Sequence, residues 1–168
     1  MNQWMYESPV GPIYLVASAR GLSGALWRPG LAPFVARLAD APVLEETVRQ
    51  LDAYFAGART TFDLPLDVEG SVFQKRVWGE LARIPFGQTV SYREIARALD
   101  HERAVRAVGG ANGRNPISII VPCHRVISAD GTLGGYAGGL AAKRGLLALE
   151  GIHFASGAVV SRSQYCVR

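Results

Sequence analysis

The first part of the chain alternates short apolar runs with turn residues, a pattern typical of strands. "GPIYLVAS", residues 11–18, is an apolar run, and "ARGLSG" after it has the composition of a turn. "ALW" continues as a second apolar run that "RPG" brings to an end. Two short strands are therefore predicted near the N-terminus.

The apolar period then changes to that of a helix. Within residues 45–55, Val48, Leu51 and Tyr54 recur at helical spacing, and Gly57 supplies a C-terminal stop. Together with the strands, this helix predicts a small α/β layer. "TTFDLPLDVEGS" follows with a proline, alternating acidic residues and a glycine, which makes it the candidate linker to a second domain.

Beyond Gly70 the pattern predicts short helices. "SVFQKRVWGELARI" has one apolar face and Ser71 as a candidate N-cap. "SYREIARALD" begins with Ser91, and Glu94 stands three residues later as its capping-box partner. A third helix is expected at about residues 103–111. Two short helices joined by a tight turn form a helix-turn-helix signature.

The third helix, in "RAVRAVGGANGRN", combines arginines with small residues. Arg103, Arg106 and Arg114 could lie near the backbone or bases of DNA. Small side chains let a helix approach another surface closely, and the small residues here are Ala104, Ala107, Gly109, Gly110 and Ala111. A solvated basic face or a tight helix-packing site would show the same pattern, so the pattern alone leaves DNA contact open.

The last part of the chain contains a strand-like run, a loop and a helix. "NPISIIVPCHRVIS" predicts an apolar strand interrupted at Pro122, and "ADGTLGGYAGG" a glycine-rich loop. "LAAKRGLLALEG" predicts a helix that Gly151 stops. Residues 156–168 carry few periodic cues and are expected to form a C-terminal tail.

Composition narrows the class of protein. With 168 residues, 49% of them apolar, the chain can bury a core in one or two domains. No apolar run reaches 18 residues, and the N-terminus lacks a basic-then-apolar leader, so a soluble cytoplasmic protein with no membrane partner is expected. The net charge of +4 is carried by 16 Arg and 2 Lys, which suits a polyanionic partner because guanidinium groups match phosphate oxygens.

Cysteine and histidine are too scarce for a metal site. Cys123 and Cys166 form neither a disulfide framework nor a zinc knuckle, and both are expected to be reduced thiols. His101, His124 and His153 have no paired spacing. Structural zinc needs about four ligands, so no metal is predicted.

Cys123 stands in a setting that suits a nucleophile. Pro122 cannot donate a ladder hydrogen bond and releases Cys123 from regular pairing, and His124 follows as a candidate base. Adjacent residues of a strand point to opposite faces, so a bridging water is expected between Cys123 and His124. Glu150, where the helix dipole disfavours a carboxylate, is a candidate to orient His124. A buried structural Cys and an exposed helix-end Glu remain the alternatives.

The motif "NPISIIVPCHRVISADGTLGGYAGGLAAKRGLLALEG" resembles the active-site segment of the O6-alkylguanine-DNA alkyltransferases, or methylated-DNA-protein-cysteine methyltransferases. The similarity extends upstream through "FQKRVWGELARIPFGQTVSYREIARAL" and "RAVRAVGGANGRNP", and more loosely into the first seventy residues. It implies an α+β protein: a ribonuclease-H-like α/β domain over residues 1–69, a mostly helical winged helix-turn-helix domain over 70–155, and the tail 156–168.

The resemblance also implies a reaction. Members of this family move an alkyl group from O6-alkylguanine in duplex DNA onto their own cysteine, irreversibly and once per molecule, after base flipping. No cofactor is needed, because the substrate carries the group that moves. Double-stranded DNA is the implied partner, the protein is expected to be a monomer without DNA, and O4-alkylthymine is an open second substrate.

By the same resemblance, each site residue acquires a role. Cys123 is the alkyl acceptor, His124 the base acting through a water, Glu150 its orienting partner, Asn115 a member of this network and Tyr92 the proton donor to guanine. Arg106 takes the place of the flipped nucleotide. The other implied DNA-binding residues are Arg93, Arg103, Ala104, Ala107, Gly109 and Arg114, and the implied base pocket consists of Tyr136, Ala137, Gly138 and Val126.

The physical chemistry of the residues agrees with these roles. O6 is hidden in the stacked duplex, so the base must rotate out, and an inserted side chain offsets that cost. Some relatives bind zinc in the N-terminal domain, but no Cys or His precedes His101 here. Two rivals remain: a thiol hydrolase with Cys123, His124 and Glu150 as its triad, and a winged-helix regulator whose cysteine senses alkylation or oxidation.

Overall fold

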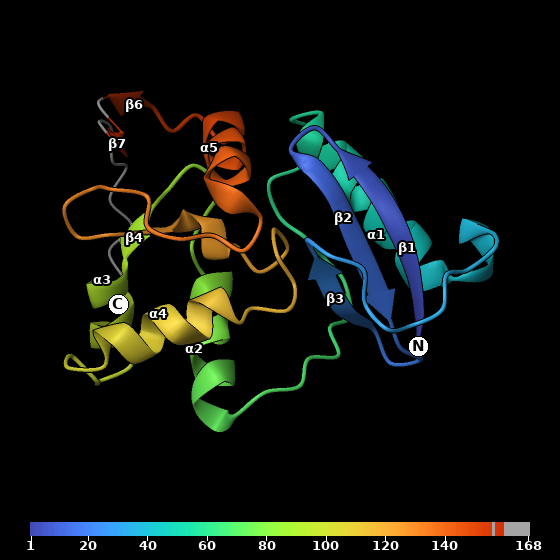
Figure 1. The fold of residues 1–168 in the computed structure, drawn as a ribbon, viewed down its shortest axis with the longest axis horizontal. Coiled ribbons are helices and arrows are strands. Elements are labelled where there is room, and N and C mark those ends of the chain that lie inside the picture. The colour runs from blue at the N-terminus through green and yellow to red at the C-terminus, as the bar shows by residue number, and fades with distance from the viewer. Residues whose placement is uncertain (156, 160–168) are drawn as a thin grey trace. The chain divides into compact units, whose positions relative to one another are not determined.

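The computed structural model describes residues 1–155 and 157–159 (Figure 1). The chain divides into two compact units. The N-terminal unit contains Met1–Glu69 and also the later segment Pro116–Ile120, and the C-terminal unit contains Gly70–Asn115 and the chain from Val121 onward. The segment just before the candidate nucleophile therefore folds with the N-terminal unit.

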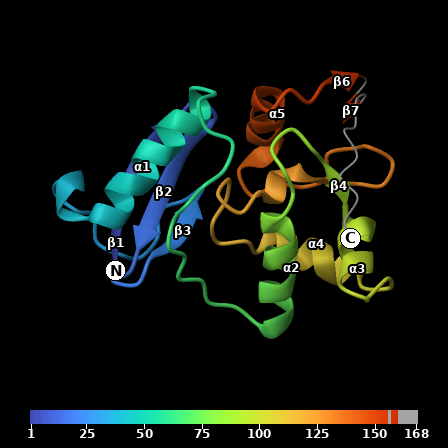
Figure 2. The same cartoon turned by 180° about the vertical axis from the view of Figure 1, so that it is seen from behind.

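The N-terminal unit is a three-stranded antiparallel sheet with one helix against it. Strands β1 (Asn2–Ser8), β2 (Gly11–Ala17) and β3 (Leu22–Leu26) pair in sequence order. After a single 3₁₀ turn (Leu38–Asp40), helix α1 (Pro42–Phe55) lies across one face of this sheet in both Figure 1 and Figure 2. The strand predicted over 11–18 and the helix are confirmed.

Three details of this unit differ from the pattern-based expectation. Strand β3 begins at Leu22, inside the turn predicted over residues 19–24, and ends before Trp27. Strand β1 was not predicted, because "NQWMYES" mixes polar residues among its apolar ones, although Gln3 and Tyr6 are both buried. Helix α1 begins at Pro42, three residues earlier than predicted, since proline fits the first turn of a helix, where its missing N–H costs nothing. Leu44 and Leu51 of α1 are fully buried.

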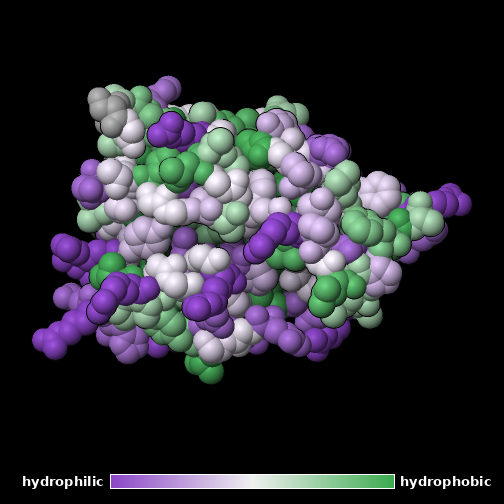
Figure 3. Space-filling model, viewed as in Figure 1, coloured by the Kyte–Doolittle hydropathy of each residue, from purple (hydrophilic) through white to green (hydrophobic). Residues whose placement is uncertain are grey.

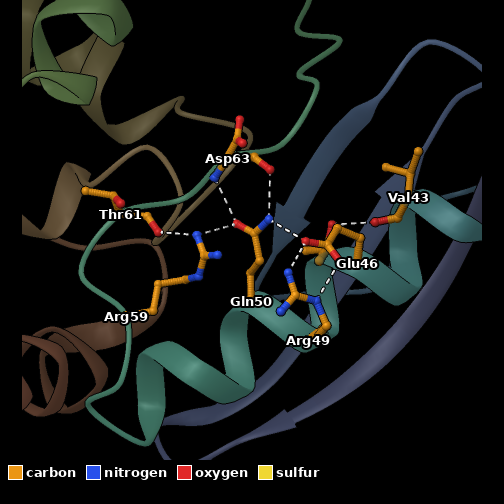
Figure 4. A network of polar contacts seen from close by, with 8 residues as sticks. Val43, Glu46, Arg49, Gln50, Arg59, Thr61 and Asp63 are labelled. Atoms are coloured by element: carbon orange, nitrogen blue, oxygen red, sulfur yellow. Dashed lines mark hydrogen bonds and ion pairs between the residues drawn. The ribbon is translucent and has the colours of Figure 1, made fainter.

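A buried glutamine fastens the chain after α1 to the helix (Figure 4). Gln50 is 2% exposed, and its amide nitrogen donates to the Asp63 carbonyl at 2.7 Å and to a Glu46 carboxylate oxygen at 2.7 Å. Its amide oxygen accepts from the Asp63 backbone N–H at 2.9 Å and from Arg59 at 3.3 Å. One side chain thus satisfies both backbone groups of Asp63.

Gln50→Leu should lower the free energy of unfolding by about 1–3 kcal/mol, because both backbone groups of Asp63 would lose their partner. Urea unfolding of the purified protein measures this change. Arg49→Ala is the control: it removes only the exposed ion pair with Glu46 and should change the free energy by about 0.5 kcal/mol or less. Equal losses of unfolding free energy in the two variants would contradict the role of Gln50 in holding Asp63.

The C-terminal unit is mostly helical. Its helices are α2 (Val72–Ala82), α3 (Tyr92–Ala98), α4 (Val105–Gly113) and α5 (Gly139–Leu149), with a 3₁₀ turn at Cys123–Arg125. Its short strands are β4 (Val90–Ser91), β5 (Val126–Ile127), β6 (Phe154–Ala155) and β7 (Ala158–Val159). Strands β4 and β5 pair in parallel, and α2 and α3 both pack on α4.

The predicted N-caps of α2 and α3 are confirmed. Ser71 caps α2 in a capping box with Gln74. Ser91 accepts from the Glu94 backbone N–H at 3.2 Å, and Glu94 accepts from the Ser91 backbone N–H at 2.6 Å. Helix α3 begins at Tyr92 as a result, which fixes this candidate proton donor at the first helical position.

Two predictions for this unit were wrong in detail. The third helix begins at Val105 rather than Arg103, because the chain first makes a turn in which the Ala104 N–H donates to the His101 carbonyl at 2.8 Å. The predicted strand through "NPISIIVPCHRVIS" consists instead of bridge positions at Ile117, Ser118 and Val121, a turn at residues 119–120, a 3₁₀ turn and the short strand β5. The positive φ of Ile119 is incompatible with a continuous strand.

The end of the described chain packs on the C-terminal unit. Phe154 of β6 and Val159 of β7 contact a buried cluster, which consists of Ile127, Leu133, Leu147 and Ile152. Strand β7 belongs to the predicted tail 156–168, whereas Cys166 lies outside the described residues. Among the helices of residues 1–155 and 157–159, none is long and apolar enough to cross a membrane.

Candidate active site

Cys123 is presented by a tight turn at Pro122. Pro122 has φ −81° and ψ 62°, and the Cys123 N–H donates to the Val121 carbonyl at 2.8 Å. These are the dihedrals and the hydrogen bond of an inverse γ-turn, which ends extended structure and turns the chain into the 3₁₀ turn. The Cys123 side chain is a thiol with only 3% of its surface exposed.

Asn115 reinforces this turn from the end of α4. Its buried side-chain amide donates to the Val121 carbonyl at 2.8 Å, the same oxygen that accepts from the Cys123 N–H. The hydrogen bond that Asn115 makes here therefore fixes the backbone beside the nucleophile. It also joins the helix with the predicted DNA-binding residues to the turn that carries the thiol.

His124 and Glu150 form a buried pair. His124 Nε2 lies 2.8 Å from Glu150 Oε1, and neither side chain is exposed. Because a carboxylate only accepts, Nε2 carries the proton in neutral His124, and Nδ1 is left as the basic nitrogen. Among the described residues, nothing hydrogen-bonds to this buried Nδ1. The geometry thus points the basic nitrogen away from Glu150.

Burial decides the protonation of the two groups in opposite ways. Burial lowers the pKa of His124, and it outweighs the hydrogen bond and charge of Glu150, which raise it. Burial alone would raise the pKa of Glu150, but hydrogen bonds and charge from His124 and Arg125 overcome it and lower that pKa to about 2. At neutral pH the pair is a neutral imidazole beside a carboxylate.

Arg125 is one of the site residues that sequence reasoning missed. Its Nε donates to Glu150 Oε2 at 2.9 Å and its Nη2 to Oε1 at 2.9 Å, a two-pronged contact, while Nη1 donates to the Ile84 carbonyl at 2.6 Å. The Gly87 N–H adds a fourth donor to Glu150 at 3.2 Å. A buried carboxylate needs such a counter-charge. The signal was present in the sequence, since Arg125 follows His124 directly.

Lys143 of α5 supplies a second buried cation. Its Nζ donates to the Val126 carbonyl at 2.6 Å and to the Leu133 carbonyl. Burial lowers the pKa of Lys143 to about 8, and negative charge at Cys123 opposes that shift. A protonated Lys143 therefore favours the thiolate form of Cys123.

Tyr92 lies close to the thiol and to the glycine-rich loop. Burial raises the pKa of Tyr92, and negative charge at Cys123 raises it further, so the phenol keeps its proton at neutral pH. A Cβ added at Gly134, whose φ is +67°, would stand 3.0 Å from the Tyr92 oxygen. Only glycine suits both the backbone angle and this close approach.

The predicted DNA-binding residues gather on α3, α4 and the turn between them. Figure 3 shows polar side chains, in purple, extending over this part of the surface. Arg93, Arg103, Arg106 and Arg114 are all exposed. Along α4 the small residues Ala107 and Gly110 are exposed as well, and Ala104 and Gly109 are half-buried. The helix thus presents arginines on a face with little bulk.

The residues predicted for the base pocket lie at the start of α5 and in β5. Tyr136 is half-buried, Ala137 is exposed and Gly138 caps α5. Val126 is fully buried, and its carbonyl holds Lys143. No group of three or more His, Cys, Asp or Glu side chains within the described part of the chain could hold a metal ion.

Two family models match this chain, and together they cover most of it. Residues 3–68 match the ribonuclease-like domain of 6-O-methylguanine DNA methyltransferase, and residues 72–152 match the DNA-binding domain of the same family. The predicted fold class, a ribonuclease-like α/β part followed by a DNA-binding part, is confirmed.

Relatives and solved structures agree with these matches. The chain is 48% identical over 150 residues to a methylated-DNA–protein-cysteine methyltransferase of Methanosarcina acetivorans, covering 88% of this chain and 96% of that protein. It is 60% identical over 106 residues to one of Mycolicibacterium paratuberculosis, covering 63% and 64%. The Mycobacterium tuberculosis OGT crystallised in complex with DNA superposes with a TM-score of 0.79 at 45% identity, covering 89% of this chain and 92% of that one. This chain therefore belongs to the 6-O-methylguanine DNA methyltransferase family.

Proposed function

We propose that this protein repairs DNA by moving the alkyl group of O6-alkylguanine in duplex DNA onto its own Cys123. The observation that carries the proposal is the buried row of Cys123, His124, Glu150 and Arg125, joined by Asn115 to the helix that presents exposed arginines. The relatives named as methylated-DNA–protein-cysteine methyltransferases and the relative crystallised with DNA support it.

The proton inventory of the site fits this reaction. His124 Nδ1, the unprotonated nitrogen, takes the proton of the Cys123 thiol through a bridging water. The Nε2–H group keeps its proton and its hydrogen bond to Glu150. Lys143 stabilises the thiolate that results. The sulfur then attacks the alkyl carbon, the S–C bond forms, and the bond from that carbon to guanine O6 breaks with its electron pair moving to guanine.

The departing guanine needs a proton, and Tyr92 is placed to give it. Its raised pKa keeps the phenol protonated until negative charge develops on the base. The proton that His124 has gained balances the charge left on the tyrosine oxygen. The product is a thioether at Cys123, whose S–C bond is not cleaved by water at neutral pH, so each molecule acts once.

The DNA must be held and the base extruded before this step. We assign phosphate and groove contacts to Arg93, Arg103 and Arg114, and insertion into the stack to Arg106, with the small residues allowing close approach. These small residues are Ala104, Ala107 and Gly109. Tyr136, Ala137 and Gly138 would wall the flipped base, with Val126 behind them in β5.

The remaining parts of the proposal concern organisation. Residues 1–69 would support the site, residues 70–155 would bind DNA and react, and the protein would act as a monomer without a metal. Since its substrate is chromosomal DNA, it would work in the compartment that holds the chromosome, the cytoplasm in a prokaryotic cell.

Intact-mass measurement tests the function directly. After incubation with excess duplex oligonucleotide that contains O6-methylguanine, the protein should gain one methyl group, located on Cys123, and no more. Cys123→Ser should still bind the lesion-containing duplex without gaining mass. Repeated turnover would favour a thiol hydrolase, and DNA binding without any gain in mass would favour a regulator. Either result would refute the proposal.

Arg106→Ala should slow methyl transfer from duplex DNA by at least about tenfold, because the vacated position in the stack would no longer be filled. Reaction with the free base O6-benzylguanine should stay within about twofold of the parent, since no base has to be extruded. Single-turnover rates for both substrates make the comparison. Arg144→Ala, on α5, is the matched control for loss of positive charge. Equal slowing with both substrates would exclude an inserted arginine.

A further inference from the structure

The segment before Cys123 contains a strained backbone turn at Ile119. Ile119 has φ +74°, and the Ile120 N–H donates to the Ser118 carbonyl at 2.9 Å. These are the features of a classic γ-turn, which is rare and strained, above all for a β-branched residue. The Ile119 side chain is only 1% exposed, so burial holds it in this conformation.

Ser118 fixes this turn to the N-terminal sheet. The Ser118 N–H donates to the Ala25 carbonyl of β3 at 3.1 Å, and the Ala25 N–H donates to the Pro116 carbonyl at 2.9 Å. The indole Nε1–H of Trp27 donates to Ser118 Oγ at 3.1 Å across 91 positions of sequence. Ser118 is 2% exposed, and Ile117 beside it is fully buried. All of these contacts lie within the N-terminal unit.

The fixed turn reaches the nucleophile through very few bonds. Ile120 is followed by Val121, whose carbonyl accepts from both Asn115 and the Cys123 N–H. Between the Ser118 anchor and Cys123, the chain therefore passes through two γ-turns, at Ile119 and at Pro122. Backbone strain persists only where its surroundings over-determine it. A weaker anchor would let the first turn relax and would displace the second.

We propose that Trp27 and Ser118 are positioning residues for alkyl transfer, because their hydrogen bond holds the strained turn that sets the backbone of Cys123. This inference rests on the proposed function, in which Cys123 accepts the alkyl group. It gives the ribonuclease-like domain a direct part in the reactivity of the thiol. Neither residue touches the substrate, and both act through the chain from Ile119 to Cys123.

The test uses two variants that each delete this hydrogen bond from one side. Trp27→Phe keeps a ring without the N–H donor, and Ser118→Ala removes the acceptor. Each should slow single-turnover methyl transfer from duplex DNA by about fivefold, the effect of one hydrogen bond lost from the arrangement. The double variant should be no slower than either single one, because both delete the same contact.

A matched control and a second measurement separate positioning from general weakening. Tyr6→Phe deletes a hydrogen bond of 2.8 Å to Asp52 in the same unit, and it should leave the transfer rate within about twofold. Hydrogen exchange followed by mass spectrometry should show faster exchange in residues 116–122 of Trp27→Phe and Ser118→Ala, but not of Tyr6→Phe. Affinity for the lesion-containing duplex should not change.

Three results would overturn the inference. The first is unchanged exchange in residues 116–122, the second is unchanged transfer rates despite faster exchange, and the third is slowing in the double variant that equals the product of the two single effects. The hydrogen-exchange measurement needs no DNA, so it still tests the anchoring contact if the parent protein fails to take up a methyl group. That failure would refute the proposed function and would leave the anchoring contact tested on its own.

Discussion

Arg125→Leu should lower the free energy of unfolding by about 3–5 kcal/mol, because the substitution leaves the Glu150 carboxylate buried without its counter-charge. Both oxygens of Glu150 would lose a guanidinium donor, and the Ile84 carbonyl would lose its partner as well. The free energy is measured by urea unfolding at neutral pH. Arg83→Leu is the control, since it removes the ion pair that the exposed Arg83 makes with Glu80 and should cost about 1 kcal/mol or less.

The same substitution should shift the pH dependence of transfer. The positive charge of Arg125 contributes to lowering the pKa of His124, so its loss should raise that pKa and protonate the base at higher pH. The acidic limb of the pH–rate profile should therefore move to higher pH in Arg125→Leu. The move should be smaller in Arg125→Lys, because lysine keeps the positive charge. A profile identical to that of the parent in the leucine variant would show that Arg125 does not act on His124.

Glu150→Gln should slow methyl transfer by at least about 100-fold, since a neutral amide can present its NH₂ group to His124 Nε2 and favour the tautomer with a proton on Nδ1. With Nδ1 protonated, neutral His124 cannot accept the thiol proton. Single-turnover rates with O6-methylguanine duplex measure the loss. Glu80→Gln, which neutralises a largely buried carboxylate that pairs with Arg83 instead of His124, should react at the parent rate. A loss below about tenfold would remove Glu150 from the catalytic network.

The Glu150 variant should also lose part of the acid sensitivity of the fold. The pKa of Glu150 is about 2 in the folded protein against 4.5 ordinarily, so its contribution is complete above pH 4.5 and is lost as the pH falls toward 2. That contribution amounts to about 3 kcal/mol at neutral pH. The pKa of His124 is lowered in the folded protein, so the stability of the fold also begins to fall below pH 6.5, where the unfolded state takes up a proton that the folded imidazole does not. In thermal unfolding, Glu150→Gln should keep the loss of stability that starts near pH 6.5 and should lack the further loss between pH 4.5 and 2.

Part of this site, the residues Cys123, His124 and Glu150, could be predicted from the local sequence. Cys123 and His124 are neighbours, and Pro122 marks the point where the chain leaves extended structure. Glu150 stood out as a carboxylate at the wrong end of a helix, and the structure gives the reason, since it is buried beside His124. The water between Cys123 and His124 stays a prediction, but the strand geometry from which it was argued is wrong, because the two residues open a 3₁₀ turn.

Contacts across long stretches of sequence explain what could not be predicted. Arg125 and Lys143 are charged residues that can be buried only because folding brings hydrogen-bond acceptors to them. The sequence does not reveal which groups those acceptors are. Trp27 and Ser118 are 91 positions apart, so no periodic pattern links them. The buried positive φ of Ile119 lies in an apolar run whose composition favours a strand. Tertiary packing overrides local preference at that position.

The membership of Pro116–Ile120 in the N-terminal unit limits how this protein can be taken apart. A cut at the linker near residue 70 would give an N-terminal fragment that lacks Ile117, the partner of Ala25 at the edge of the sheet. The other fragment would carry Ile117 and Ile119 without the N-terminal unit to which their segment belongs. Expression of either half alone should yield an aggregation-prone product, so swapping modules between relatives requires grafting the late segment together with the early one.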